Sequence, residues 1–183
     1  MGIFRQKPDP LVIRQRNHSG LGQINIWLPP LLAICVIATE STKTFGADHT
    51  SRFLRPLLEH LFGHMGDAMW DVLHHLLRKS GHFIGYGLVC LSFLRSWLLL
   101  IAGTVDLSVP AWRIRASLAA ILSTATIASL DEWHQTYLPN RTGNATDVLL
   151  DTCGASTIVL LVWIILWRRS VSSGRRIART AVS

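Results

Sequence analysis

The stretch VLLDTCGASTIVLLVWIILW, residues 148–167, decides the fold class because apolar side chains dominate it over its whole length. A helix that crosses the hydrocarbon core of a bilayer needs roughly 20 residues, with a range of about 17–25. Three further apolar blocks precede this stretch, and they run about Ile24–Thr39, His82–Ala102 and Ile114–Leu130. The sequence therefore predicts an all-α fold, a multi-spanning membrane bundle of about four transmembrane helices.

Composition supports a single membrane domain. The chain has 183 residues, of which 49% are hydrophobic, and its mean hydropathy is +0.32. No segment outside the apolar blocks is long enough to form a soluble domain with its own core. We expect the membrane domain to cover residues 24–167, between a cytoplasmic basic tail at 1–23 and another at 168–183.

The formal charge of +7 could indicate nucleic-acid binding, but the positions of the charges favour a membrane. Basic residues cluster before the first block and after the last. They are Arg5, Lys7, Arg14, Arg16, Arg168, Arg169, Arg175, Arg176 and Arg179. By the positive-inside rule, both tails are cytoplasmic, which requires an even number of spans. We expect a multi-pass protein of the cell (inner) membrane whose tails meet anionic lipid head groups, with no nucleic-acid partner.

The first block could instead be a cleaved signal peptide, since a basic segment precedes it. Pro29 and Pro30 within it, and Thr39-Glu40-Ser41 at its end, make a poor cleavage region. Its removal would also leave three spans and disturb the charge rule, so we expect it to be a span.

The segment Glu40–Ser80 is more than a plain loop. Apolar residues recur at helical spacing in two short stretches, around Leu57 and Leu61 and then around Leu73 and Leu77. We expect Ser51–Lys79 to be helical and to lie at the interface, or to be re-entrant, with these leucines toward lipid or the bundle. A helix simply packed on the bundle fits the same period.

The second of these stretches runs directly into the second span. Asp71, His75, Lys79, His82 and Tyr86 follow at steps of four, four, three and four, which places them on one face of one helix.

Two features concern packing between the spans. Gly81 and Gly85 offer a small-residue surface for close helix approach. The third span is rich in small and hydroxyl residues, so we expect it to be the central helix.

Ionisable and polar residues gather at the ends of the spans that face away from the basic tails. They are Lys79, His82, Tyr86, Asp131, Glu132, Gln135, Arg141, Asp147 and Asp151, with Arg141 in the turn Pro139–Asn144. An ionisable group near hydrocarbon is costly, so such groups are usually paired and functional. The pattern predicts one outward-facing polar cluster that is functional rather than structural.

Simpler roles fit some members of the cluster. Lys79 and Arg141 could anchor span ends, Tyr86 could belong to an aromatic belt, and Asp147 could favour a helix N-terminus. Asp151 is not explained in this way, because it lies about 6 Å further along the fourth span than Asp147. We expect Lys79 or Arg141 to be its partner.

No motif for a metal, a cofactor or a nucleophile is present. The histidines include close pairs such as His60 with His64, but no HExxH pattern occurs, and the three cysteines all fall in apolar blocks without a CxxC motif. There is no GxSxG or SxxK motif either. We therefore expect no metal and no cofactor, and we take His82 with Glu132 as the candidate pair for acid–base chemistry.

These motifs, in this order, resemble those of the VanZ-like family of small membrane proteins, and the resemblance covers Ile24–Trp167. The matching residues are Lys79, His82, Phe83 and Tyr86, then Glu132 and Gln135, then Arg141 and Asp147, and finally Asp151 and Gly154. The chain departs from the family pattern in two places, since the family often has Asn where Asp151 stands and a second Gly where Ile158 stands. The resemblance implies a bundle of about four spans and, for the founding member, low-level resistance to the glycopeptide teicoplanin. It implies no known reaction.

Four functions remain open at this point. The first is binding or modification of an envelope lipid or lipid-linked wall precursor, with Arg141 and Lys79 holding its anionic group. The others are a membrane-embedded hydrolase or transferase using His82 and Glu132, a small transporter, and a structural partner of another membrane protein. A transporter places its site near the midplane, so charges at one end count against it.

We predict that both termini are cytoplasmic, because basic residues flank an even number of spans. Reporter fusions at the two ends, each active on only one side of the membrane, should give the cytoplasmic signal at both. An external C-terminus would overturn the placement of the cluster on the outer side.

Overall fold

The computed structural model describes residues 2–41, 47–104, 107–138 and 143–180. Every regular element in these ranges is an α-helix. They are α1 (Gly2–Arg5), α2 (Pro10–Asn17), α3 (Gly20–Glu40), α4 (Ala47–Phe62), α5 (Asp67–Thr104), α6 (Val109–Gln135) and α7 (Ala145–Thr180). The all-α prediction is confirmed.

Four helices are long and apolar enough to cross a membrane. They are α3, α5 over Asp67–Gly103, α6, and α7 over Ala145–Arg168. Each contains one of the four apolar blocks, so the predicted number of spans is confirmed and the chain is a multi-pass membrane protein.

The four spans alternate in direction. Two contacts between each pair of consecutive spans show their relative direction. For α3 and α5 the contacts are Ile26–Ser96 and Ile37–Gly85. For α5 and α6 they are Tyr86–Asp131 and Trp97–Ser123, and for α6 and the start of α7 they are Ser117–Trp163 and Glu132–Asn144. From one contact to the next, the residue number rises on one helix and falls on the other, so the two helices of each pair run antiparallel. The chain therefore enters the first span and leaves the fourth at the same end of the bundle.

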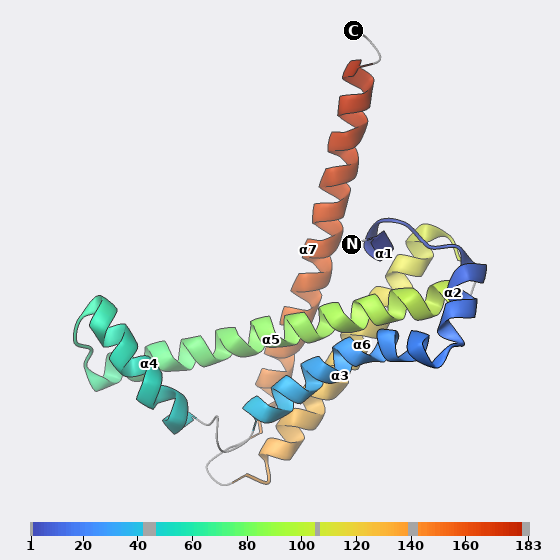
Figure 1. Ribbon diagram of the computed structural model, residues 1–183. Coiled ribbons are helices and arrows are strands. Elements are labelled where there is room, and N and C mark those ends of the chain that lie inside the picture. The colour runs from blue at the N-terminus through green and yellow to red at the C-terminus, as the bar shows by residue number, and fades with distance from the viewer. Residues whose placement is uncertain (1, 42–46, 105–106, 139–142, 181–183) are drawn as a thin grey trace.

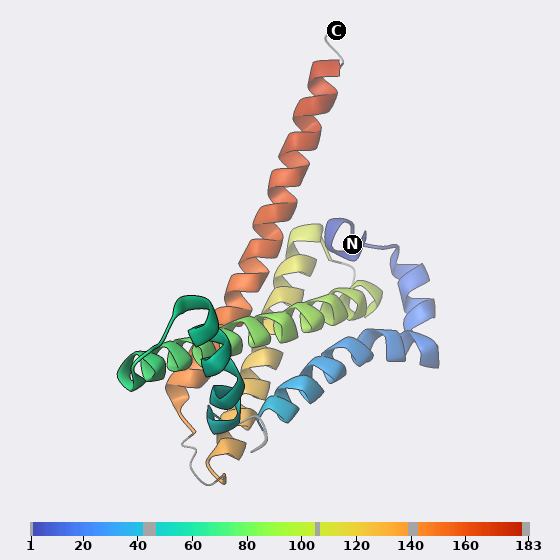
Figure 2. The ribbon, with the colours of Figure 1, turned by 60° about the vertical axis from the view of Figure 1, so that its left-hand side comes forward.

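The central helix is α5, not α6 as the small residues of the third span led us to expect. Half of the residues in the most apolar part of α5 are buried (50%), against 33% in α6. Figures 1 and 2 show α3, α6 and α7 all lying against α5. Small side chains let α6 approach its neighbours closely, but they do not require it to be surrounded.

Of the two glycines expected to allow close helix packing, Gly85 lies against a neighbouring helix and Gly81 does not, and the closest approach between helix backbones occurs at Gly154. A Cβ added at Gly81 would meet nothing within 4 Å, whereas one added at Gly154 of α7 would lie 2.2 Å from the Phe83 carbonyl oxygen of α5. Gly87 lies against the same glycine, with its Cβ position 3.3 Å from the Gly154 carbonyl oxygen. Gly85 does contact a neighbour, Ile37 of α3.

The first span contains Pro29 and Pro30, and α5 compensates for both. Proline has no N–H, so the carbonyl groups of the residues four positions earlier lose their helical partners. These are Asn25 and Ile26. The Arg95 guanidinium donates to the Asn25 carbonyl oxygen at 2.8 Å, and the Ser96 hydroxyl donates to the Ile26 carbonyl oxygen at 2.6 Å.

Between Ala47 and the second span, the described residues are helical except at Gly63–Gly66. Gly63 has φ +90, a conformation that suits glycine, and it ends α4. The second amphipathic stretch does run without a break into the second span, as α5. The predicted helicity of Ser51–Lys79 is thus confirmed apart from this turn, and its position at the interface stays a prediction.

Arg55 fastens α4 to the start of α5. Its guanidinium donates to Glu59 at 3.2 Å, to Asp67 at 2.8 Å and to the Met65 carbonyl oxygen at 3.0 Å, and it lies over the Trp70 ring. The hydrogen bond from Arg55 lowers the pKa of Glu59 below its usual value. The opposite face of α4 is apolar and exposed at Phe53, Leu57 and Leu61.

We predict that Ser96→Ala destabilises the protein by about 1–2 kcal/mol, because it leaves the buried Ile26 carbonyl group without a donor. In a Pro30→Ala background the same change should cost much less, since the alanine restores a backbone N–H that can bond that carbonyl group. Thermal unfolding in detergent measures both effects, with Ser156→Ala on the exposed side of α7 as the control. Equal losses in the two backgrounds would contradict this account of the prolines.

Candidate functional site

The predicted polar residues come together where α3 and α6 end and α7 begins. All three ends lie beside the part of α5 from Lys79 to Tyr86. We call the described members of this group the polar cluster: Lys79, His82, Tyr86, Asp131, Glu132, Gln135, Asp147 and Asp151. Arg141, which we expected to join them, lies outside the described residues.

Two contacts between a basic and an acidic side chain connect α5 to α7, one helical turn apart. Lys79 pairs with Asp147. His82 Nδ1 lies 3.6 Å from Asp151 Oδ1, which is too long for a good hydrogen bond; the contact is ionic only when the imidazole is protonated. Of the two partners that we expected for Asp151, Lys79 instead pairs with Asp147, the acid nearer the helix start. Arg141, the other expected partner, lies outside the described residues, so that alternative stays a prediction.

Asp131 is the hydrogen-bonding centre on α6. The Tyr86 hydroxyl donates to Oδ2 at 3.1 Å, the Gln135 amide donates to the same oxygen at 3.0 Å, and the Ser41 hydroxyl donates to Oδ1. Ser41 follows α3, so this one carboxylate joins three helices. The Tyr86 side chain is fully buried, and its ring stacks on that of His82 with centroids 6.1 Å apart.

Glu132 holds the start of α7. Its Oε2 accepts a hydrogen bond from the Asn144 backbone N–H at 2.8 Å, and the side chain is buried. The chain before Asn144 passes close to α6, since a Cβ at Gly143 would lie 2.2 Å from the Glu132 carbonyl oxygen. Glu132 is thus turned toward the 143–144 backbone, and Asp151, not Glu132, is the acid beside His82.

Three buried carboxylate oxygens have no hydrogen bond from any described residue. They are Oε1 of Glu132 and both Oδ atoms of Asp151. Buried polar atoms are usually paired, and most exceptions reflect strain, a functional role or a missing partner. These orphaned atoms favour a functional role for the cluster.

A cavity of about 230 Å³ opens beside the cluster. Its polar lining comes from Glu40, Ser41, Thr50, Arg78, His82 and Asp131, and its apolar lining from Ile37, Leu54, Leu77 and Gly81. The walls therefore belong to α3, α4, α5 and α6. Sequence reasoning missed Glu40, Ser41 and Arg78, although the amphipathic face of α4 could have indicated that a helix covers this end.

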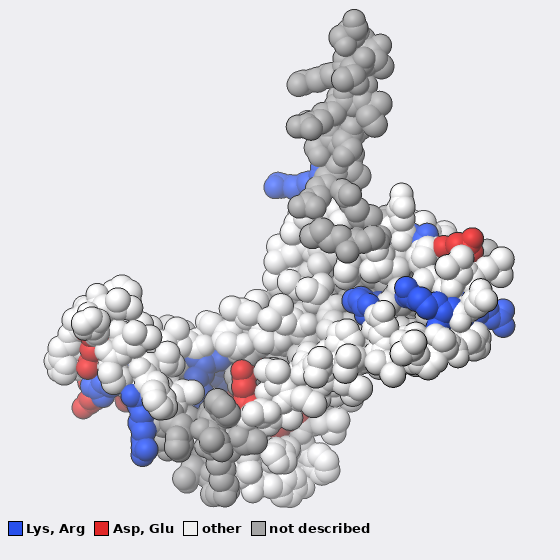
Figure 3. Space-filling view, in the orientation of Figure 1, with Lys and Arg blue, Asp and Glu red and all other residues white. Residues whose placement is uncertain are grey.

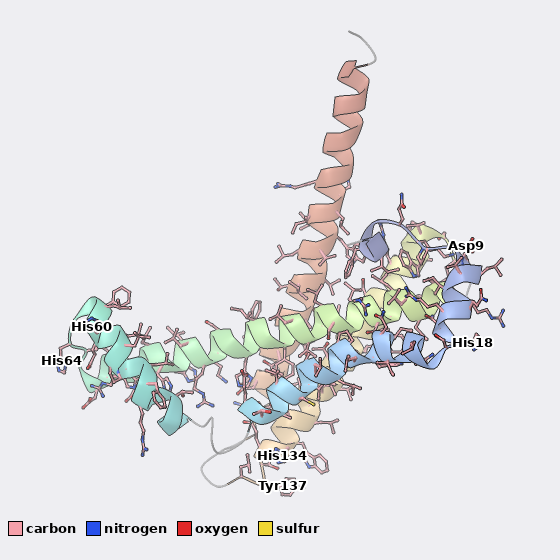
Figure 4. The ribbon with its side chains drawn as sticks, viewed as in Figure 1. Asp9, His18, His60, His64, His134 and Tyr137 are labelled. Atoms are coloured by element: carbon pink, nitrogen blue, oxygen red, sulfur yellow. The ribbon has the colours of Figure 1, made fainter. Side chains whose placement is uncertain are left out.

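The histidines that Figure 4 labels lie in three separate parts of the molecule. Figure 4 shows His60 and His64 near the far end of α4, His134 beside Tyr137 at the end of α6, and His18 near α2. Within the described residues, no group of three or more His, Cys, Asp and Glu could hold a metal ion.

The opposite end of the bundle is basic. Lys7 donates to the Leu107 carbonyl oxygen at 2.8 Å, and the Arg113 guanidinium lies 5.0 Å from the centre of the Trp163 ring. Figure 3 shows mostly blue atoms over α2 and its surroundings, whereas red and blue mix over α4. Charge is thus divided between the two ends of the spans.

Fold and site together define a multi-pass helical membrane protein with a polar cluster and a cavity at one end of its spans. The family model VanZ/LLP1 matches residues 26–167, and the chain belongs to this family. No curated protein and no solved structure matches the chain.

We predict that the Lys79–Asp147 pair couples α5 to α7 by about 1–3 kcal/mol, because both side chains are partly shielded from solvent, with 31% and 22% of their surface exposed. A double-mutant cycle with Lys79→Met and Asp147→Asn, read by unfolding in detergent, measures the coupling. The matched control is Arg55→Met with Asp67→Asn, since Asp67 is largely exposed and its pair should give less than about 1 kcal/mol. Equal coupling in the two cycles would show that Lys79 and Asp147 are no better shielded than a surface pair.

Proposed function

We propose that the cavity beside the polar cluster binds the polar head group of an envelope lipid or of a lipid-linked wall precursor, on the outer side of the membrane. The observation that carries this proposal is the mixed lining of the cavity. Ionisable groups from Glu40, Arg78, His82 and Asp131 lie on the same walls as Ile37, Leu54 and Leu77. An amphipathic ligand fits such a site, because its head group finds polar partners while its chains stay against apolar surface.

Arg78 is the guanidinium of the cavity wall, and a guanidinium suits a phosphate or carboxylate. We had assigned this role to Lys79 and Arg141. Lys79 pairs with Asp147 and is not among the described residues that line the cavity, whereas Arg78 is.

The basic end of the bundle supports an outward orientation of the cavity. Basic residues favour the cytoplasmic side, and the cavity lies at the other end of the spans. An effect on glycopeptide (teicoplanin) susceptibility would then follow from altered handling of a surface lipid or precursor. We include this effect in the proposal as its cellular consequence.

A second candidate function is a membrane-embedded hydrolase or transferase, and one observation favours it. His82 lines the cavity while its Nδ1 faces the fully buried Asp151. A carboxylate behind an imidazole orients the ring and stabilises its charged form, which suits a general base. In this candidate Asp151 replaces Glu132 as the partner of His82.

We predict that lipids retained by the purified protein decrease when the cavity wall is changed. Arg78→Gln and His82→Gln should each lower the amount of lipid bound after detergent extraction, measured by native mass spectrometry. Arg52→Gln is the control, because Arg52 is exposed on α4 and does not line the cavity. Unchanged retention in both cavity variants would contradict lipid binding at this site.

Glu132→Gln separates a functional cluster from one that only holds helices together. If the cluster is functional, this near-isosteric variant should accumulate and melt like the wild type while it loses lipid retention or an effect on antibiotic susceptibility. A lower melting temperature, with no separate loss of function, would support a structural role for Glu132 instead.

A further inference from the structure

We propose that the ligand of this cavity carries a primary ammonium group next to a phosphate, as in a phosphoethanolamine head group. The inference rests on the proposed function and specifies its ligand. It follows from the charges and hydrogen-bonding groups that the described walls present.

Asp131 supplies the first part of the argument. Three donors converge on its carboxylate, from Tyr86, Gln135 and Ser41. All three donors are neutral, so they fix the position of the carboxylate without cancelling its charge. Two carboxylate oxygens offer about four acceptor sites, which leaves room for one more donor on the cavity side.

The described walls of the cavity carry ionisable groups of both signs. Glu40 adds a second carboxylate to the lining, and its side chain is exposed. Among the described residues of the lining and the polar cluster, the carboxylates are Glu40, Asp131, Glu132, Asp147 and Asp151, and the permanent cations are Arg78 and Lys79. Within the described lining of the cavity, the carboxylates of Glu40 and Asp131 lie on the same walls as Arg78 and His82, so a zwitterionic head group matches these walls better than a purely anionic one.

The buried acids point the same way. Asp151 is fully buried and Glu132 nearly so, and three of their oxygens lack a hydrogen-bonding partner among the described residues. A cation on the ligand would lower the free-energy cost of ionising these buried carboxyl groups, whereas an anion on the ligand would raise that cost.

The kind of cation follows from the lining. A quaternary ammonium group is usually held by aromatic faces, and no Phe, Tyr or Trp is among the described residues that line the cavity. A primary ammonium group instead has three N–H donors, which suit carboxylates such as Asp131 and Glu40. Arg78 on the same walls can take the phosphate of that head group.

The test is lipid selection by the full-length protein. The protein is placed in nanodiscs that hold equal amounts of phosphatidylethanolamine, phosphatidylcholine and phosphatidylglycerol with identical acyl chains. After detergent extraction, the retained lipids are quantified by mass spectrometry. We expect about tenfold enrichment of phosphatidylethanolamine, which is the scale of one charged hydrogen bond.

Two variants ask whether the carboxylates cause the selection. Asp131→Asn and Glu40→Gln should each reduce the enrichment of phosphatidylethanolamine without raising that of phosphatidylcholine. Glu40→Gln is the safer variant, because Glu40 is exposed and makes no contact on which the fold depends among those described. Asp9→Asn is the matched control at the opposite end of the bundle, and its asparagine can still cap α2.

The other outcomes are distinct. Enrichment of phosphatidylglycerol that depends on Arg78 would overturn the ammonium inference and leave the proposed function intact. Equal retention of phosphatidylcholine, or no enrichment of any of the three lipids, would overturn the ammonium inference. The proposed function is decided separately, by the lipids that the purified protein retains and by their loss in Arg78→Gln and His82→Gln. Displacement of the lipid by free phosphoethanolamine would support the ammonium inference and show that the head group alone is recognised. Binding of phosphatidylethanolamine without displacement by free phosphoethanolamine would show that the acyl chains contribute as well.

Discussion

Polar groups inside a bilayer must find partners within the protein, and in this molecule α5 supplies most of them. Near one end, Arg95 and Ser96 bond the two carbonyl groups that the prolines of α3 leave open. Toward the other end, Tyr86 donates to Asp131 of α6, and Lys79 and His82 meet the two acids of α7. Because one helix serves three neighbours, the rotation of α5 about its axis fixes how all the spans pack.

The close approach of α5 and α7 gives these pairs their register. Gly154 brings the backbone of α7 against Phe83 and Gly87, where any larger residue would collide with a carbonyl group. On the N-terminal side of that contact, the pairs His82–Asp151 and Lys79–Asp147 lie one helical turn apart on both helices. A small packing feature in the middle of the spans therefore positions ionisable groups at their end.

Much of this architecture could be predicted from the sequence. The four apolar blocks gave the number of spans, and the amphipathic period after Gly66 correctly extended the second span toward Asp67. The residues of the polar cluster were also predicted, because ionisable groups stand out in apolar sequence. Arg141 remains outside the described residues, so its part in the cluster stays a prediction.

The pairing within the cluster could not be predicted. Lys79 could reach either acid of α7, and only the depth of the Gly154 contact assigns it to Asp147 and leaves Asp151 to His82. Likewise, Gly81 and Gly87 look alike in sequence, and the choice between them depends on the rotation of α5. The roles of Ser41 and Arg78 depend on where α3 ends and where α4 folds back, which local periodicity does not specify.

The position of α4 connects the segment between the spans to the candidate site. Thr50 and Leu54 of this helix form part of the cavity wall, while Arg55, one residue further on, holds the helix to Asp67 and Trp70. Ser51 accepts a hydrogen bond from the Trp70 indole at 2.8 Å, and Thr50 lies 3.1 Å from His74 Nε2. The wall is thus held by short polar contacts to the start of α5, on the same helix that carries Arg78 and His82. Any force that moves α4, such as insertion of its exposed apolar face into a lipid surface, must also change the shape of the cavity.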